Sequence, residues 1–185
     1  MFQRSSFNRR MIVLFSLLFS NFFLLSVAVS VNADQSTKID ETIPWEVSNQ
    51  GKEPTDVTTW RREIPGADVK QFRGEVLLNH PALHVLSAIN NIQDLDKWVY
   101  FCRDSYKIDD TDNVYMEYKG VWPVASRYVA LQNNFEIKGG VILINSVNIK
   151  GVGPQPKNMV RIQEFNNLFE VTPLGPNTTK LRFTT

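Results

Sequence analysis

The stretch Lys119-Gly-Val-Trp-Pro-Val-Ala-Ser-Arg-Tyr-Val-Ala-Leu-Gln132 is the most informative part of this 185-residue chain. Proline fixes its own φ angle and moves the preceding residue out of the helical region, so Trp122-Pro123 predicts a rigid turn. The residues from Ser126 onward predict a strand, with Arg127 close to its start. The stretch is therefore interpreted as a corner between two strands that holds a large aromatic side chain at a fixed position.

The residues on both sides of this corner predict further strands. The strand before the corner is predicted at 114–120, and a short strand precedes it at 105–108. After the corner, strands are predicted at 126–137, 141–149, 159–164, 168–172 and 178–185. Nearer the N-terminus, 57–64 and 70–78 predict two strands. Between these two groups the pattern is helical. Two strands, a helical insert and at least five antiparallel strands predict an α+β domain over residues 57–185.

The helical insert begins after Asn79-His80-Pro81, because proline suits the first position of a helix. Its apolar residues recur at helical spacing and are Ala82, Val85, Leu86, Ile89 and Ile92. Asp94 predicts the cap of a second short helix, whose apolar positions are Leu95, Trp98, Val99 and Cys102. Cys102 is the only cysteine, so the chain has no intrachain disulfide, and it is interpreted as a small buried hydrophobe.

The first 33 residues are typical of a cleaved secretory signal. Arg4, Arg9 and Arg10 precede an almost wholly apolar run over residues 11–29, and Val31-Asn32-Ala33 supplies small residues before the predicted cleavage point. The alternative is an uncleaved anchor through residues 11–29. In both cases the body is expected to be exported, to the periplasm or as a secreted protein. Residues 34–56 are polar and predict a linker or arm, which Trp45 would attach to the body.

The charge of the body excludes one class of partner. The formal net charge is +1, and because the first 33 residues carry three arginines and no acid, the remainder carries −2. A nearly neutral body argues against nucleic-acid binding and against a polybasic membrane surface. Contact with a membrane is expected to be transient.

The order of the segments resembles the START family, the steroidogenic-acute-regulatory-related lipid-transfer domains. Trp122-Pro-Val-Ala-Ser-Arg127 is similar to the family's "PWP…R" turn, and Trp98 with Cys102 is similar to its "W…C" helix. The segments that follow the family order are 58–66, 71–77, 96–102, 114–118, 122–127, 159–163 and 174–181. The resemblance implies a helix-grip fold, in which a curved antiparallel sheet grips a long C-terminal helix around a lipid tunnel.

The chain departs from the family pattern in two places. Tyr128 stands where the family usually has an aspartate after the arginine, so a role for an Arg–Asp pair at the turn is not carried over. The sequence also ends at Thr185, before the expected position of the family's C-terminal helix. The domain at 57–185 is therefore expected to be incomplete at its C-terminus.

Four polar residues are candidates for ligand binding, because a lipid tunnel needs a few polar groups among apolar walls. They are Glu117, Arg127, Asn133 and Asn145, all in predicted strands. Some sterol-binding relatives carry an acidic–basic pair in the cavity. Glu117 resembles the acidic member, whereas the basic position falls near Asn133, which is uncharged. The apolar wall is expected from residues 141–149.

Three functional hypotheses remain open at this stage. The first is a non-enzymatic exported protein that binds, and potentially transfers, a lipid or sterol-like ligand without a cofactor. The second is a helix-grip enzyme, cyclase-like or hydrolase-like, that acts on a hydrophobic substrate with Glu117 as the first catalytic candidate. The third is an incomplete product that cannot close its cavity. His80 and His84 are four residues apart, but no third ligand accompanies them, so no metal site is predicted.

Overall fold

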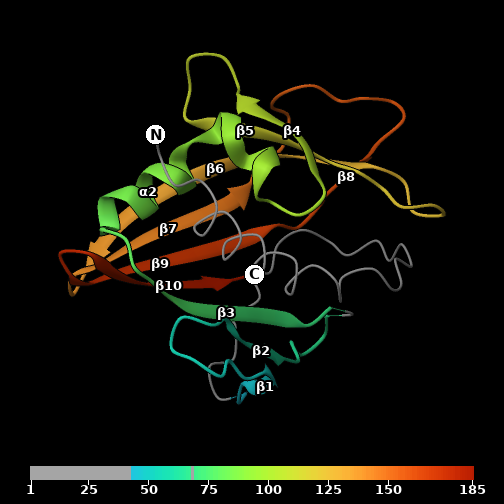
Figure 1. Cartoon of the computed structure of the whole chain (residues 1–185). Helices are drawn as coiled ribbons and strands as arrows, with labels where there is room; N and C mark the ends of the chain where they lie inside the picture. The colour runs from blue at the N-terminus through green and yellow to red at the C-terminus, as the bar shows by residue number, and fades with distance from the viewer. Residues whose placement is uncertain (1–42, 68) are drawn as a thin grey trace.

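The alternation that predicts a sheet for most of the chain is confirmed. The structure, a computed structural model, describes residues 43–67 and 69–185. Within these residues ten strands form one sheet (Figure 1). The elements are β1 (Glu46–Asn49), β2 (Thr58–Arg62), β3 (Gln71–Leu78), α2 (Ala82–Asn90), the 3-10 helix η1 (Ile92–Lys97), β4 (Cys102–Lys107), β5 (Asn113–Tyr118), β6 (Arg127–Lys138), β7 (Val141–Asn148), β8 (Val160–Arg161), β9 (Asn166–Gly175) and β10 (Thr178–Thr184).

The sheet runs in the order β1-β2-β3-β10-β9-β7-β6-β5-β4, and all neighbours in this path are antiparallel. The pairing of β3 with β10 therefore joins the early strands to the end of the chain. The segment predicted as a strand over 159–164 forms only the two residues of β8, which pair in parallel with β6. The sheet curves, and both helices lie on one of its faces, which we call the inner face (Figure 1).

Helix α2 forms where its apolar spacing predicts it. Pro81 directly precedes the helix, and Val85 and Ile89 are buried against the inner face. Its other side faces solvent, where Leu83 is exposed. One stripe of apolar residues thus determines both the position and the orientation of the helix.

The second predicted helix is shorter than expected. It is the 3-10 helix η1, and it ends before Trp98. Cys102, predicted on this helix, is instead the first residue of β4, where it pairs with Tyr118 of β5. The backbone cannot be helical at a residue that hydrogen-bonds into the sheet, so the sheet pairing overrides the helical spacing. Cys102 is buried, as expected for a small hydrophobe.

Two hydrophobic clusters lie on opposite faces of the sheet. The main cluster fills the inner face and includes Val129, Ile144, Val171, Leu181 and Phe183, all at most 1% exposed. The second cluster lies on the outer face near β4, β5 and β6, and consists of Ile108, Tyr115, Tyr128 and Ala130 with Tyr106, Ile149, Val152 and Met159 against it. Strand β5 is therefore covered on both faces.

The segment predicted as a linker contains the edge strand β1, which pairs with β2. Just before it, the ring of Trp45 lies 4.4 Å from the guanidinium carbon of Arg62 and 4.0 Å from that of Arg73. Such stacking of arginine on tryptophan is a favourable contact. It attaches this arm to the outer face. The predicted signal or anchor at 1–33 lies outside the described residues.

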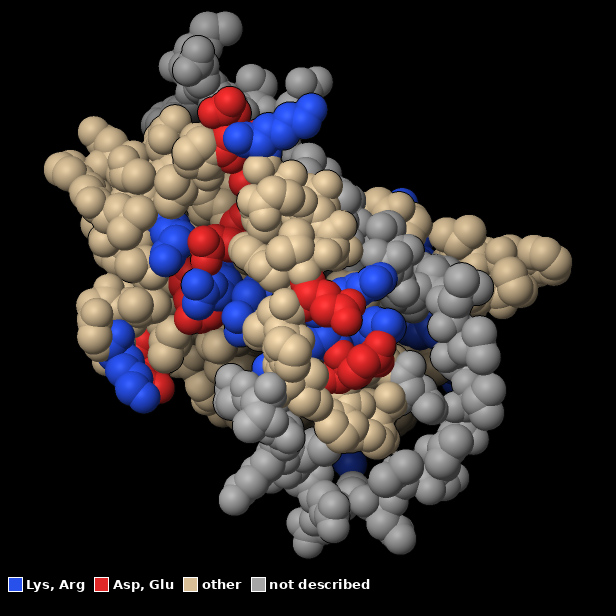
Figure 2. Space-filling view, turned by 90° about the horizontal axis from the view of Figure 1, so that it is seen from below, with Lys and Arg blue, Asp and Glu red and all other residues tan. Residues whose placement is uncertain are grey.

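The outer face of β3, β10 and β9 carries charges of both signs. Arg182 of β10 donates two hydrogen bonds to Glu75 of β3, at 2.9 and 2.7 Å, and lies 3.6 Å from Glu170 of β9. Figure 2, seen from the side of β1 to β3, shows Lys and Arg intermixed with Asp and Glu. Among the described residues in this view, positive and negative side chains lie next to one another.

Candidate functional site

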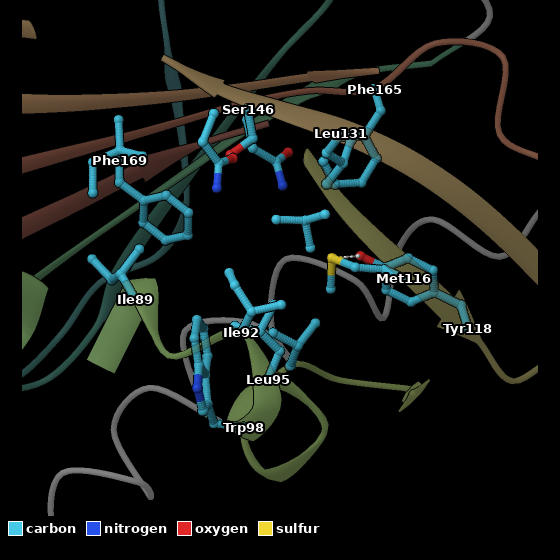
Figure 3. A pocket seen from close by; sticks show the side chains of 15 residues that line it. Ile89, Ile92, Leu95, Trp98, Met116, Tyr118, Leu131, Ser146, Phe165 and Phe169 are labelled. Carbon is cyan, nitrogen blue, oxygen red and sulfur yellow. Dashed lines mark hydrogen bonds between the residues drawn. The ribbon is translucent and has the colours of Figure 1, made fainter. Parts of the chain in front are cut away.

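A cavity lies between the inner face of the sheet and the segment formed by α2 and η1. Its volume is about 50 Å3. Figure 3 shows the side chains of the 15 residues that line it, directed toward a common space. They are Ile89, Ile92, Leu95, Trp98, Val99, Val114, Met116, Tyr118, Leu131, Asn133, Ile144, Ser146, Phe165, Asn167 and Phe169.

Most of the cavity wall is apolar for reasons visible in the sequence. The helical spacing of the insert directs Ile89, Ile92 and Leu95 to one side. The opposite wall comes from alternate residues of neighbouring strands, such as Val114 of β5 and Leu131 of β6, which are paired in register. Two periodic patterns, one helical and one of strands, thus enclose the same apolar space.

A row of three polar side chains crosses this wall. Asn133 of β6 pairs with Ser146 of β7, and Ser146 pairs with Asn167 of β9, so the three lie side by side on adjacent strands. The Ser146 hydroxyl donates a hydrogen bond of 2.7 Å to Oδ1 of Asn133. Asn167 is 5% exposed, and its Oδ1 is buried without a hydrogen-bond partner among the described residues. An unpaired buried acceptor is costly, and such a group calls for a partner that the fold does not supply.

Tyr118 adds one more polar group to the cavity. Its hydroxyl lies 3.6 Å from the sulfur of Met116, and burial raises the pKa of the phenol above its ordinary value. Every residue of the lining is therefore uncharged near neutral pH. The described part of the chain also contains no cluster of His, Cys, Asp or Glu arranged to hold a metal ion.

The structure separates the four residues predicted to bind ligand. Asn133 lines the cavity. Arg127 lies on the same face of β6, as its spacing from Asn133 predicts, but at the start of the strand and outside the lining, where its Nη1 donates to the carbonyl oxygen of Ala125 at 3.3 Å. Arg127 and Asn133 therefore share one face of β6, as predicted, but only Asn133 lines the cavity.

Glu117 and Asn145 point to the outer face. Glu117 forms an ion pair with Arg103 and accepts a hydrogen bond of 3.3 Å from the hydroxyl of Tyr115. Asn145 adjoins Ser146 in β7, and successive side chains of a strand point to opposite faces. Like Asn167, Asn145 has a buried Oδ1 without a partner among the described residues. Neither Glu117 nor Asn145 belongs to the cavity lining.

Sequence reasoning missed Ser146 and Asn167. The run 141–149 is apolar on both faces of β7. The alternation of residues therefore did not show which of its side chains point inward. Pairing Asn133 with the polar residue on the same face of β7 would have selected Ser146. Asn167 fell in a predicted loop, because the strand was expected to begin at residue 168 whereas β9 begins at Asn166.

Comparison with known proteins places this geometry in a known fold. No protein-family model matches the chain, and no curated protein sequence matches it. Among solved structures, the STAR-related lipid transfer protein of Xanthomonas axonopodis, fragment 25–204, is 20% identical with a TM-score of 0.67, over 76% of this chain and 80% of that one. The chain has the START fold.

Two human structures agree with this assignment. StAR-related lipid transfer protein 5 is 14% identical with a TM-score of 0.61, and the match covers 97% of this chain and 81% of that one. STARD10 is 16% identical with a TM-score of 0.64, over 76% of this chain and 59% of that one. The predicted START resemblance and the α+β, helix-grip fold class are thereby confirmed at the level of the fold.

The buried proton-bearing groups predict that the folded state loses stability in alkali. Burial raises the pKa of the Cys102 thiol from 9.0 to about 11 and raises the pKa of Tyr118 above 10.0. The unfolded chain therefore releases these protons first, so their stabilising contribution is complete below about pH 9 and declines as the pH rises above it. We expect the free energy of unfolding in urea to fall between pH 8 and pH 10.5, and less steeply in Tyr118→Phe. A free energy that is constant over this range would contradict the assignment.

Proposed function

We propose that this chain binds one hydrophobic, lipid-like ligand in the cavity and carries it without chemical change. The observation that supports this most directly is the mostly apolar lining of the cavity, with a row of polar side chains on one wall. Burial of apolar surface drives such binding, at about 25 cal/mol per Å2. A few polar groups then orient the ligand. The solved structures of the same fold that are described as lipid transfer proteins are consistent with this function.

The cavity must widen to admit a lipid. Its 50 Å3 is room for about four water molecules, whereas ligand pockets are usually about 300–1,000 Å3. Strand β5 is packed on both faces and forms a firm wall. On the other side, η1 is a short 3-10 helix whose main packing partners are β4 and α2. We therefore propose that the segment from Ile92 to Phe101 moves outward when a ligand enters.

The catalytic alternative lacks a suitably placed group. Glu117, the acid–base candidate, lies on the outer face in an ion pair with Arg103. The cavity lining contains no Asp, Glu, His, Lys, Arg or Cys. General acid–base catalysis needs a titrating group within hydrogen-bond reach of the substrate. These placements favour binding over turnover, and Glu117→Gln is expected to leave ligand affinity unchanged.

The binding proposal is tested by native mass spectrometry and by Nile red, a neutral hydrophobic dye. The protein purified without detergent is expected to carry a lipid adduct or to bind the dye. Val114 is 2% exposed in the cavity wall, so Val114→Phe fills the free space and should weaken dye binding by about tenfold or more.

Val47→Phe is the matched control, because Val47 is 55% exposed on β1 and the same substitution there leaves the cavity unchanged. Thermal unfolding establishes that both variants are folded. An unaltered dye affinity in a folded Val114→Phe variant, or no adduct and no dye binding in the unmodified protein, would refute the proposal.

We also propose that the protein is exported, on the pattern of residues 1–33. Expression of the full sequence in a Gram-negative host should give a mature protein that starts at Asp34, which N-terminal sequencing of the periplasmic fraction would establish. An intact N-terminus in the membrane fraction would indicate the anchor through residues 11–29. An intact, soluble cytosolic product would contradict export.

The Trp122 turn is the proposed contact with a donor or acceptor membrane. Trp122 is 91% exposed and Val121 is 49% exposed. The turn is tight, because the position of a Cβ atom added at Gly120 would lie 2.2 Å from the carbonyl oxygen of Val124. Tryptophan favours the interface between lipid and water. No helix among the described residues is long and apolar enough to cross a bilayer.

Removal of this side chain should weaken membrane association. Trp122→Ala is expected to reduce binding to phosphatidylcholine vesicles by about tenfold, because the burial of a large apolar side chain is lost. Flotation of vesicles through a sucrose gradient measures the bound fraction. Leu83→Ala removes another exposed apolar side chain, from α2, and is the control. Equal vesicle binding by the unmodified protein and Trp122→Ala would exclude this turn as the contact.

A further inference from the structure

Two segments that meet beside the Trp122 turn carry basic residues and no acidic ones. They meet because β8 pairs in parallel with the start of β6. Figure 1 shows both segments at the end of the sheet where β8 lies. Residues 118–128 and 156–163 contain no Asp or Glu, and their four basic residues are Lys119, Arg127, Lys157 and Arg161. We call these two segments together the basic end of the molecule.

The four cations of the basic end are not neutralised by carboxylates. None of them forms an ion pair with a described residue. Arg127 and Arg161 each donate to a backbone carbonyl oxygen, which is uncharged, and Lys119 and Lys157 are exposed. Glu117, the acid closest in sequence before the first segment, is already paired with an arginine. The positive charge is therefore available to an anionic partner.

The charge of the body is distributed more unevenly than its total suggests. Residues 34–185 carry a formal charge of −2 and the basic end carries +4, so the rest of these residues carry −6. The near-neutral total argued against a polybasic surface, but a total does not show where the charges lie. An anionic surface would attract the basic end and repel the remainder, which sets the orientation in which the molecule approaches.

Exposed apolar side chains lie among these cations. Trp122 is 91% exposed, Val121 is 49% exposed and Val160 is 51% exposed. Val160 of β8 is the register partner of Arg127. Basic side chains are attracted to anionic head groups, and tryptophan favours the boundary between head groups and acyl chains. A nucleic acid would pair with the cations but would leave the two valines in water, so the combination favours a membrane.

We propose that the basic end docks on a bilayer that contains anionic phospholipid, with Trp122 in the head-group region and the four cations against the lipid phosphates. The inference rests on the proposed membrane contact at Trp122 and adds the charge of that membrane. The N–H of Lys119 donates a hydrogen bond of 2.8 Å to the carbonyl oxygen of Phe101, the last residue of the segment proposed to move. Docking in this way brings the proposed entrance of the cavity close to the membrane.

The test compares flotation with two kinds of vesicle, phosphatidylcholine alone and phosphatidylcholine with a minority of phosphatidylglycerol. The protein is expressed with its full sequence, so all variants share the same N-terminal residues. Binding to the mixed vesicles is expected to be at least about tenfold tighter, because each basic side chain near an anionic surface adds attraction. In about 1 M salt, where the Debye length falls to about 3 Å, the two affinities should become equal.

Matched variants assign the preference to the basic end. Lys119→Gln combined with Lys157→Gln should weaken binding to the mixed vesicles by about tenfold or more and leave binding to phosphatidylcholine unchanged. Lys52→Gln combined with Lys138→Gln is the control, because both lysines are exposed, lie outside the basic end and form no ion pair with a described residue. The control removes the same net charge and should keep the preference. Lys119→Arg combined with Lys157→Arg should keep it as well.

The outcomes separate this inference from the proposed function. Equal binding to both kinds of vesicle at low salt would overturn the inference and leave the Trp122 contact in place. Equal losses in the two glutamine double variants would also overturn it, because the effect would then follow net charge alone. So would a single-stranded DNA oligonucleotide that binds as tightly as the mixed vesicles and depends on the same two lysines. Absence of binding to either vesicle would refute the membrane contact itself, whereas Nile red binding without vesicles reports separately on the cavity.

Discussion

The register of β6, β7 and β9 is the constraint on which the site depends. Side chains alternate between the two faces of a strand, so a shift of one residue exchanges every inward group for an outward one. In β7 such a shift would bring Asn145 into the cavity and place Ser146 outside. The register pairs that fix the present arrangement, Asn133 with Ser146 and Ser146 with Asn167, also create the polar row. The chemistry of the cavity is thus a property of strand pairing more than of any single side chain.

Much of the fold was predictable because its signals are local. The Trp122-Pro123 turn, the apolar stripe of α2 and the alternation of β5 each depend on neighbouring residues. The START resemblance added the order of the segments along the chain, and the helices and strands of the structure occur in that order. The end of the second helix was not predictable in this way. Cys102 satisfies the helical spacing, but its backbone pairs with Tyr118, a partner that is distant in sequence.

The candidate site was less predictable than the fold, for a physical reason. A polar residue in a strand is informative only once its face is known, and the apolar run of β7 supports either assignment. Glu117 and Arg127 therefore looked more suitable than Asn133, although the structure places only Asn133 in the lining. The prediction of ligand-binding residues favoured charged side chains, because a charged residue in a predicted strand is easy to notice in a sequence. The polar groups of the cavity lining are instead uncharged amides and hydroxyls. This agrees with the high cost of burying an unpaired charge.

The second hydrophobic cluster has a consequence for the time course of ligand exchange. Strand β5 is packed on both faces and gives the cavity one stiff wall. The opposite wall consists of Ile89 of α2 and the short 3-10 helix η1, which is followed by irregular chain. Affinity depends on the contacts that both walls make with the ligand. Under the proposed outward movement of this segment, the rates of ligand entry and release depend on the free energy needed to displace it. Substitutions that loosen η1 would then accelerate loading and unloading together, and the time that a ligand stays bound would be set separately from the choice of ligand.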